Sequence, residues 1–374
     1  MKYFSLLFPV FLILLFPTVF SQDIFTFVLH CEHEEICDKL EREFANVGII
    51  IASNLVLNTK ILVDVTYEPL DPDDFAETET NLMKFVSPGD QVERLYPTAL
   101  LKQLNTGIDF GDAADIIMSI NSVINFWFPS DGGDIQPDQY DILATSLHEM
   151  MHGLGITTTW RFPPDIDTYL TPRLNGVEIG KIKEPVTFEG FYESVFDKNL
   201  IYINVDDPDD ERRITEIAQD LNGFTPKGTE FPTVDALFDA FTASDQENNA
   251  ELMLEYATTE LSLHFILPDE QEPVLLHTTE EFAAGTSISH FDQGAYEDTP
   301  DFLMIPSLRQ GVSLKTLIQD TGDNPGGGIG PELRLVLKTL GYTVNENPPM
   351  GSTSTPQKRR FTRRNNQRKP LIHF

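Results

Sequence analysis

Hydrophobic and polar positions follow two different periods in the first part of the chain. Residues 24–29 form a short apolar, β-branched run, which predicts a strand. In residues 34–47, Ile36, Leu40 and Phe44 recur four apart, which predicts an amphipathic helix. Two further β-branched runs, 47–57 and 60–67, predict strands. The resulting order of strand, helix, strand and strand predicts an α/β opening of the fold.

Residues 96–153 predict a short helix, one or two strands, a turn and a second helix, in that order. Residues 96–104 predict a short helix, and residues 114–128 are rich in Ile, Phe and Trp, which predicts one or two strands. A turn follows at residues 131–134, which read Asp-Gly-Gly-Asp. Either Asp138 or Asp141 can then cap a helix that runs to about Gly153.

Residues 156–285 form a long section without a tandem repeat. It mixes strand-like stretches (200–205 and 261–267) with helix-like ones (211–221, 234–241 and 250–259). We interpret it as an insertion or second lobe within one catalytic unit. A separate ligand-binding domain is the alternative. A helix over 332–340 closes the body, so the predicted fold class is α+β.

The two ends differ from the body. Residues 1–21 have one Lys and then an uncharged apolar run, the pattern of a signal peptide cleaved after Ser21. A membrane anchor is the alternative, but the run is short for spanning and has a Pro at each end. Residues 347–374 hold seven basic residues and no acid, and we expect a disordered tail. It could be solvated, removed by a dibasic-cutting protease, or in contact with the acidic body.

Composition and charge narrow the class of protein. The 374 residues are 41% apolar and carry a net charge of −33, enough apolar content for a buried core. Nucleic acid and anionic membranes are disfavoured as partners, because both are bound through Lys and Arg. No segment after the signal is apolar enough to span a membrane. We therefore expect a secreted, extracellular, soluble protein that is a monomer.

The chain has two cysteines, Cys31 and Cys37. In an exported protein a close, even pair predicts one disulfide bond. Because His30 and His33 flank Cys31, a zinc site is an alternative, and so is a free inhibitory thiol.

The strongest chemical signal is the segment His148-Glu149-Met150-Met151-His152. Two histidines four apart lie on one face of a helix, where both imidazoles can bind one Zn²⁺. Glu149 follows the first ligand and can act as general base toward a water activated by the metal. Gly155 allows a sharp change of chain direction just after the helix.

The third ligand has to come from farther along the chain. HExxHxxG begins the metzincin signature, which normally ends in a His three residues later, but that position is Thr158. Of the other histidines, His290 has the best context, because Met304 follows it within a turn-like segment, Asp301 to Pro306. Asp292 could help to order the site from outside the ligand set. The remaining candidates are His30, His33, His264, His277 and His373.

Together these motifs resemble the leishmanolysin-type metzincins. The match comprises HExxHxxG at 148–155, an insertion over 156–285, Ser-His-Phe-Asp at 289–292, Leu-Met-Ile-Pro at 303–306, and a closing helix that ends in Gly341-Tyr342. The chain departs from that family in its cysteines, since leishmanolysins are cysteine-rich and carry a propeptide with an inhibitory thiol.

The resemblance implies a zinc endopeptidase that acts on protein or peptide substrates. It implies His148, His152 and His290 as zinc ligands, Glu149 as the catalytic base and Met304 as support beneath the metal. It further implies a metzincin-like catalytic domain, with a twisted mixed sheet and the active-site helix in residues 22–155. We expect residues 286–346 to form a C-terminal lobe that contributes the third ligand and the turn with Met304. The substrate would lie along a sheet edge, which we assign to residues 115–128.

Two other functions fit the sequence. Glu193 begins an ExxxD segment that ends at Asp197, so a gluzincin-type zinc peptidase with Glu193 as third ligand is one alternative. The other is a secreted binding protein on a metalloprotease scaffold that has lost activity. The intact Glu149 argues against it, because a scaffold without activity has no need for that carboxylate.

Overall fold

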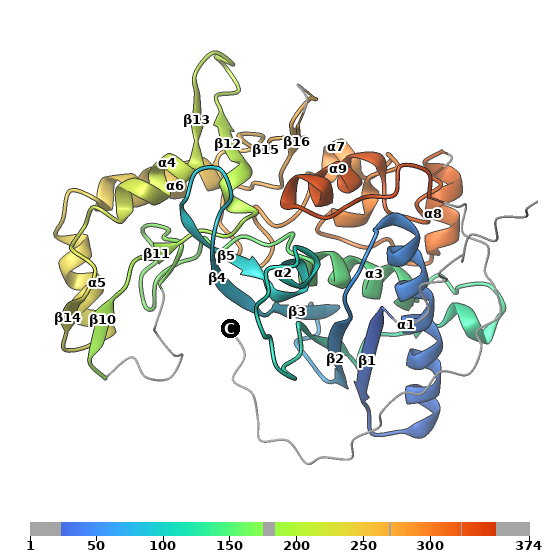
Figure 1. Ribbon diagram of the computed structural model, residues 1–374. Helices are drawn as coiled ribbons and strands as arrows, with labels where there is room; N and C mark the ends of the chain where they lie inside the picture. The colour runs from blue at the N-terminus through green and yellow to red at the C-terminus, as the bar shows by residue number, and fades with distance from the viewer. Residues whose placement is uncertain (1–23, 175–183, 269–270, 323, 349–374) are drawn as a thin grey trace, which may run out of the picture.

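A computed structural model describes residues 24–174, 184–268, 271–322 and 324–348. The predicted signal peptide and the predicted basic tail lie outside these residues. The described part is a mixed α/β structure with several small sheets. Figure 1 shows the N-terminal sheet at one end of the molecule and the predicted insertion at the other.

The largest N-terminal sheet has four strands in the order β1-β2-β6-β3. β1 (Phe25–His30), β2 (Ile61–Glu68) and β6 (Ile116–Asn121) are parallel, and β3 (Ala76–Thr80) joins β6 antiparallel. The sheet is therefore mixed, as predicted. Its strands β1 and β2 confirm the runs predicted at 24–29 and 60–67.

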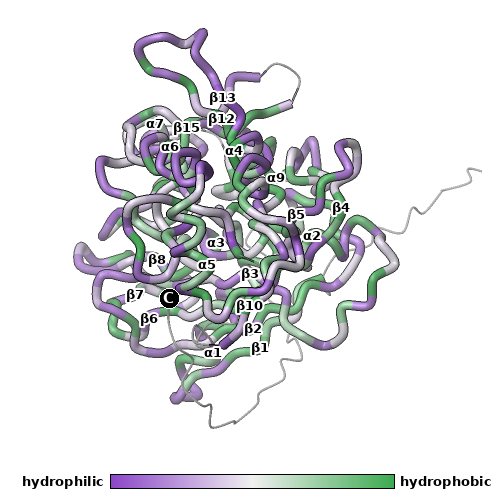
Figure 2. The backbone as a smooth tube through the Cα atoms, turned by 90° about the vertical axis from the view of Figure 1, so that its left-hand side faces the viewer, coloured by the Kyte–Doolittle hydropathy of each residue, from purple (hydrophilic) through white to green (hydrophobic). Residues whose placement is uncertain are grey.

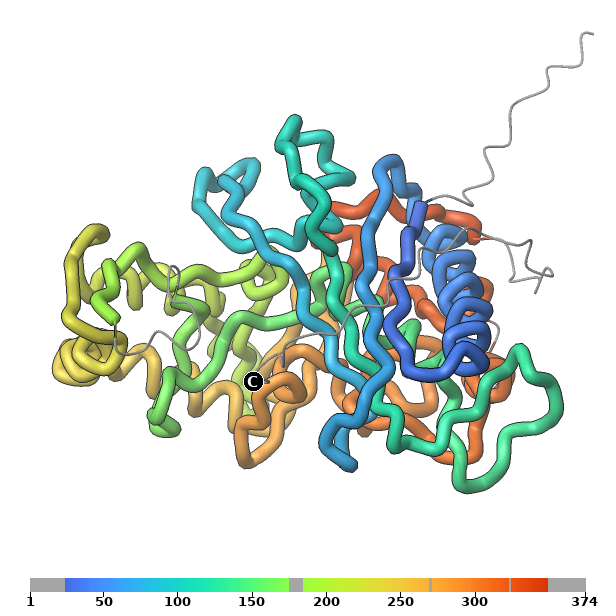
Figure 3. The backbone as a smooth tube through the Cα atoms, turned by 90° about the horizontal axis from the view of Figure 1, so that it is seen from below, coloured from blue at the N-terminus to red at the C-terminus, as the bar shows by residue number. Residues whose placement is uncertain are grey.

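Two helices cover one face of this sheet. α1 (Glu34–Asn54) packs on β1, where Gly48 lies against Phe25 and Phe27, and it also contacts α3 (Ile142–Gly153). α3 packs on β6 and β3. A Cβ at Gly153 would lie 2.5 Å from the Ile116 side chain, so a glycine here permits the close approach of α3 to the sheet. Figure 3 shows α1 running alongside the strands β1 and β2.

The strand predicted over 47–57 is wrong. α1 continues through this segment to Asn54. Val47 and Ile51 are fully buried and follow Leu40 and Phe44 at the three- and four-residue spacing of a helix, so burial of one helical stripe prevails over the β-propensity of the Ile-rich run.

The sheet edge was also predicted at the wrong segment. Residues 114–128 do form two strands, β6 and β7 (Phe126–Trp127), but β6 is an inner strand between β2 and β3. The edge strands are β1 and β3, and β3, the edge that contacts α3, begins two residues after the acidic turn Asp71–Asp74. Its sequence, Ala-Glu-Thr-Glu-Thr, lacks the apolar alternation by which a strand is predicted.

A hairpin and a helix connect β3 to β6. The hairpin strands are β4 (Leu82–Val86) and β5 (Glu93–Pro97), and α2 (Thr98–Gln103) follows directly, close to the helix predicted over 96–104. A short 3-10 turn, η1 (Pro129–Asp131), and the short strand β8 (Tyr140–Asp141) precede α3.

The described part of the insertion folds into small sheets and three α-helices. The helices α4 (Ile214–Leu221), α5 (Val234–Thr242) and α6 (Glu247–Thr258) lie close to the predicted ones, but residues 211–213 are a strand. In Figure 2 the projecting hairpin between β12 and β13 is largely hydrophilic. The strands are β9 (Arg173–Leu174), β10 (Val186–Phe188), β11 (Phe191–Tyr192), β12 (Leu200–Ile203), β13 (Glu211–Arg213), β14 (Thr229–Phe231), β15 (Leu263–Phe265) and β16 (Val274–Leu275).

The C-terminal segment returns to the N-terminal sheet region. It contains α7 (Gln293–Tyr296), a 3-10 turn η3 (Phe302–Met304), α8 (Leu314–Asp320) and α9 (Pro331–Leu340), the last as predicted. After α9, the Val56 amide donates to the Thr343 carbonyl at 2.8 Å, and the Asn345 amide donates to the Asn54 carbonyl at 2.7 Å. The first and last parts of the described chain are thus joined.

Among the described residues, we find no helix with the length and apolar character needed to cross a membrane. Cys31 and Cys37 are disulfide-bonded, as predicted, so neither provides a thiolate ligand or a free thiol.

Candidate metal centre

α3 begins and ends through specific local interactions. Asp141 is its N-cap, and one carboxylate oxygen accepts from the Leu143 and Ala144 amides at 2.8 and 3.3 Å. The other oxygen accepts from the Leu314 amide at 2.7 Å, which ties the start of α8 to the start of α3. At the far end, Gly155 has a φ of +115°, so the predicted change of direction after the helix is confirmed.

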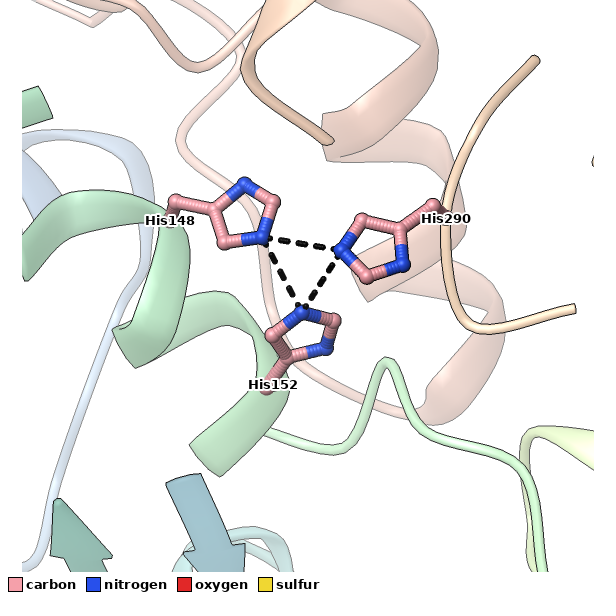
Figure 4. A group of neighbouring side chains, drawn as sticks. All are labelled: His148, His152 and His290. Carbon is pink, nitrogen blue, oxygen red and sulfur yellow. Dashed lines mark hydrogen bonds between the residues drawn. The ribbon is translucent and has the colours of Figure 1, made fainter. Parts of the chain in front are cut away.

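Three histidines converge at one point. His148 and His152 project from α3, and His290 comes from the segment just before α7 (Figure 4). Their Nε2 atoms form a triangle with sides of 3.1 Å (148–290), 3.1 Å (148–152) and 3.3 Å (152–290). All three side chains are largely buried, and His148 and His290 are 8% and 7% exposed.

The opposite ring nitrogen of each histidine contacts a backbone carbonyl. His148 Nδ1 lies 2.6 Å from the Leu303 oxygen, His152 Nδ1 lies 2.7 Å from the Ile156 oxygen, and His290 Nδ1 lies 2.9 Å from the Thr286 oxygen. A carbonyl can only accept, so each Nδ1 is the protonated donor. Each Nε2 of a neutral ring then carries a lone pair, and three lone pairs that face one another cannot hydrogen-bond.

A metal ion at the centre of the triangle would resolve this arrangement. With Zn–N bonds of 2.0–2.1 Å, two ligands of a tetrahedral site are separated by about 3.3 Å, close to the three observed distances. The Nδ1–carbonyl contacts are of the kind that orients metal-binding histidines in proteins. Burial lowers the pKa of His148 to about 3, helped by the nearby His152, and burial also lowers the pKa of His290, so both rings stay neutral and able to bind metal.

Glu149 is 7% exposed and follows the first histidine on α3. Burial raises the pKa of its carboxyl, an effect opposed by His152. Its carboxylate also interacts electrostatically with Thr78 and Glu77 of β3. Glu149 therefore faces the edge strand, and the Thr80 hydroxyl of the same strand donates to the His152 carbonyl at 2.9 Å.

The turn that contains Met304 contacts both parts of the centre. The Leu303 carbonyl orients His148, and the Met304 carbonyl accepts from the Phe291 amide at 2.8 Å, one residue after His290. The Met304 side chain is fully buried. The predicted turn is therefore adjacent to the histidines.

Several other sequence candidates do not join this group. Glu193 is 4% exposed, and its Oε1 atom accepts from Arg94 Nε at 2.6 Å and from the Thr215 hydroxyl at 2.6 Å. Asp292 caps α7 by accepting from the Ala295 amide at 2.8 Å, and the histidine with which it interacts electrostatically is His277, outside this group. Within the described residues, the three-residue group that could hold a metal is His148, His152 and His290. His30, His33, His264 and His277 are outside it, and His373 is not described.

The sequence did not reveal the edge strand or the carbonyl partners of the histidines. β3 carries few apolar residues, so its only signal is the alternation of β-branched Thr with Glu. The carbonyl groups of Leu303, Ile156 and Thr286 belong to the backbone, so the residue types in a sequence do not identify them.

Comparison with known proteins identifies relatives. A Schizosaccharomyces pombe protein, named "Uncharacterized protein PB7E8.01", is 26% identical over 356 residues, which cover 84% of this chain and 59% of the relative. The chain thus corresponds to less than two thirds of that relative's length. No solved structure matches the chain. Residues 14–366 match the SPBPB7E8-like family, and the chain belongs to this family.

Proposed function

We propose that this protein is a secreted zinc-dependent endopeptidase of metzincin type. The observation that carries the proposal is the triangle of three Nε2 lone pairs, each ring held by a backbone carbonyl, beside the buried Glu149. His148, His152 and His290 would hold the metal as neutral imidazoles. When bound, Zn²⁺ would supply Lewis acidity toward a peptide carbonyl and a water molecule.

Glu149 would accept a proton from the attacking water and deliver it to the leaving amine. Its burial favours this role, because a carboxyl in a poorly solvated place has a raised pKa and holds a proton more readily. The gluzincin alternative is weakened, because Glu193 does not join the group of convergent ligands and its Oε1 already accepts from Arg94 and Thr215.

The edge strand β3 supports an extended peptide as substrate. Hydrogen bonds flank β3 at both ends: the Asn121 amide donates to the Phe75 carbonyl, and the Asn81 amide donates to the Asp115 carbonyl. In an antiparallel pair, hydrogen-bonded residues alternate along the strand, so the odd-numbered residues of β3 hydrogen-bond to β6. The backbone N–H and C=O groups of residues 76, 78 and 80 then point away from β6. A peptide added to this edge would run beside Glu149.

Export is part of the proposal. A disulfide between Cys31 and Cys37 fits an oxidising compartment, and residues 1–21 have the composition of a signal peptide.

The test compares the parent protein with Glu149→Gln on a denatured protein substrate, with and without a chelator. We expect chelator-sensitive cleavage by the parent and a loss of about 10²–10⁴-fold in the variant, the usual contribution of a general base. The matched control is Glu43→Gln, because Glu43 is also buried but lies on α1 and accepts from the Ser130 amide at 2.8 Å. Cleavage by Glu149→Gln at the parent rate would refute the mechanism. No cleavage by a zinc-loaded parent would favour a binding protein.

A further inference from the structure

A buried carboxylate joins two chain segments close to the metal centre. Asp197, in the 3-10 turn η2 (Asp197–Asn199), is fully buried. Its Oδ1 accepts from the Thr158 hydroxyl at 2.6 Å. Its Oδ2 accepts from the Thr159 amide at 2.9 Å, from the Thr159 hydroxyl at 2.6 Å and from the Ser194 amide at 2.9 Å. The metal-binding mechanism proposed above does not use this carboxylate.

The same interactions reach the third histidine. The Thr158 amide donates to the Ser289 hydroxyl at 3.1 Å, and Ser289 directly precedes His290. Thr158 stands where the short metzincin motif has its third histidine. Here its side chain contacts Asp197, and its backbone contacts the segment that brings the third histidine from elsewhere.

The segment that carries His290 needs support from outside. Ile288 has a φ of +70°, a left-handed conformation that is unfavourable for a β-branched residue and costs on the order of 1–3 kcal/mol. The Ile288 amide donates to the His277 carbonyl at 2.9 Å, and the His277 amide donates to the His290 carbonyl at 2.8 Å. Ser289 is 3% exposed and adds the contact toward Thr158.

We propose that Asp197 is a positioning residue for the third metal ligand. Asp197 fixes Thr158, Thr158 fixes Ser289, and Ser289 sets the place of His290 relative to α3. The proposal rests on the metal-binding part of the proposed function. It also implies that the insertion contributes to the metal centre, because Asp197 and Ser194 belong to the insertion.

The test removes single links of this chain and measures metal affinity. Thr158→Val removes the hydroxyl bound to Asp197, and Ser289→Ala removes the acceptor of the Thr158 amide. The dissociation constant for Zn²⁺ is measured by competition with a chromophoric chelator, and the Co²⁺-loaded proteins give a visible spectrum that reports ligand geometry. Loss of an outer hydrogen bond around a metal ligand costs about 10–100-fold in affinity. We expect about a tenfold loss in each variant, with Thr158→Ser restoring the parent value.

Ser262→Ala is the matched control for general destabilisation. Ser262 is fully buried in the insertion, and its hydroxyl donates to the Tyr256 carbonyl at 2.6 Å instead of joining the contacts that link Asp197 to His290. It should lower the melting temperature but leave the Zn²⁺ affinity and the Co²⁺ spectrum unchanged. Unchanged Zn²⁺ affinity in either Thr158→Val or Ser289→Ala would overturn the proposal, as would an equal loss in Ser262→Ala. A parent that binds Zn²⁺ but cleaves no peptide would refute the proposed function while the affinity comparison stands.

Discussion

Replacing Gly155 by Ala tests how the end of α3 places His152. Gly155 has a φ of +115°, and a Cβ there would lie 2.7 Å from Pro97 Cγ. The left-handed conformation costs a residue with a Cβ about 1–2 kcal/mol. Overpacking against a neighbour adds about 1–3 kcal/mol. Because Pro97 Cγ belongs to a rigid ring, it cannot rotate away, and we expect a total loss of about 2–5 kcal/mol.

Gly89→Ala separates the two contributions. Gly89 has a similar φ of +103°, but beyond its chain neighbours no atom of the described residues would lie within 4 Å of a Cβ at this position. This control should therefore lose only the conformational part, about 1–2 kcal/mol. For a protein of this size a loss of 1 kcal/mol lowers the melting temperature by about 1–2 °C. Gly155→Ala should melt clearly below Gly89→Ala in calorimetry.

The same substitution should weaken metal binding. The Ile156 carbonyl, one residue after Gly155, holds His152 Nδ1 at 2.7 Å. A shift of the chain at Gly155 moves that carbonyl, so we expect a Zn²⁺ affinity about tenfold lower, against no change in Gly89→Ala. Equal melting temperatures for the two variants would refute the steric argument. Parent-like Zn²⁺ affinity in Gly155→Ala would refute the link to His152.

Two further predictions concern buried carboxylates that are not part of the three-histidine group. Arg94→Ala should lower the free energy of unfolding, measured in urea, by about 3–5 kcal/mol, because it leaves Glu193 buried without its cation. The variant should still bind Zn²⁺. Loss of the metal would instead support Glu193 as a ligand. Burial raises the pKa of Asp301 from 3.8 to about 7, so the folded state holds this proton more tightly than the unfolded chain. The stabilisation of the folded state by the protonated Asp301 is therefore fully present below about pH 4 and is lost as the pH rises to about 7. The stability of the parent relative to Asp301→Asn should fall across that range, and a constant or rising difference would contradict the assignment.

The sequence predicted those parts of the site that depend on residue type and short spacing. α3 was predictable because its cap, its two histidines and its final glycine lie within 15 residues, from Asp141 to Gly155. His290 was predicted through the resemblance to a known motif order, and the structure brings it to the other two histidines. Its approach to α3 depends on long-range contacts such as Thr158 to Ser289, which no local pattern encodes.

The errors share a physical cause. The Ile-rich run after Val47 has β-propensity, but its helical stripe is buried against the sheet and α3, so tertiary packing decides. β3 was missed because an edge strand needs only one buried face, and its alternating Glu and Thr residues resemble a polar loop. Glu193 and Asp197 were noted as a candidate ligand segment, and both proved to be buried, hydrogen-bonded carboxylates with other partners.

The most direct test of the metal centre is the zinc content of the purified protein beside His290→Ala, measured by elemental analysis. His264→Ala is the matched control, because His264 lies in β15 outside the convergent group. Three convergent imidazoles predict about one zinc per chain in the parent and in His264→Ala, and much less in His290→Ala. A full zinc equivalent retained by His290→Ala, or no zinc in the parent after incubation with the metal, would contradict the three-histidine centre.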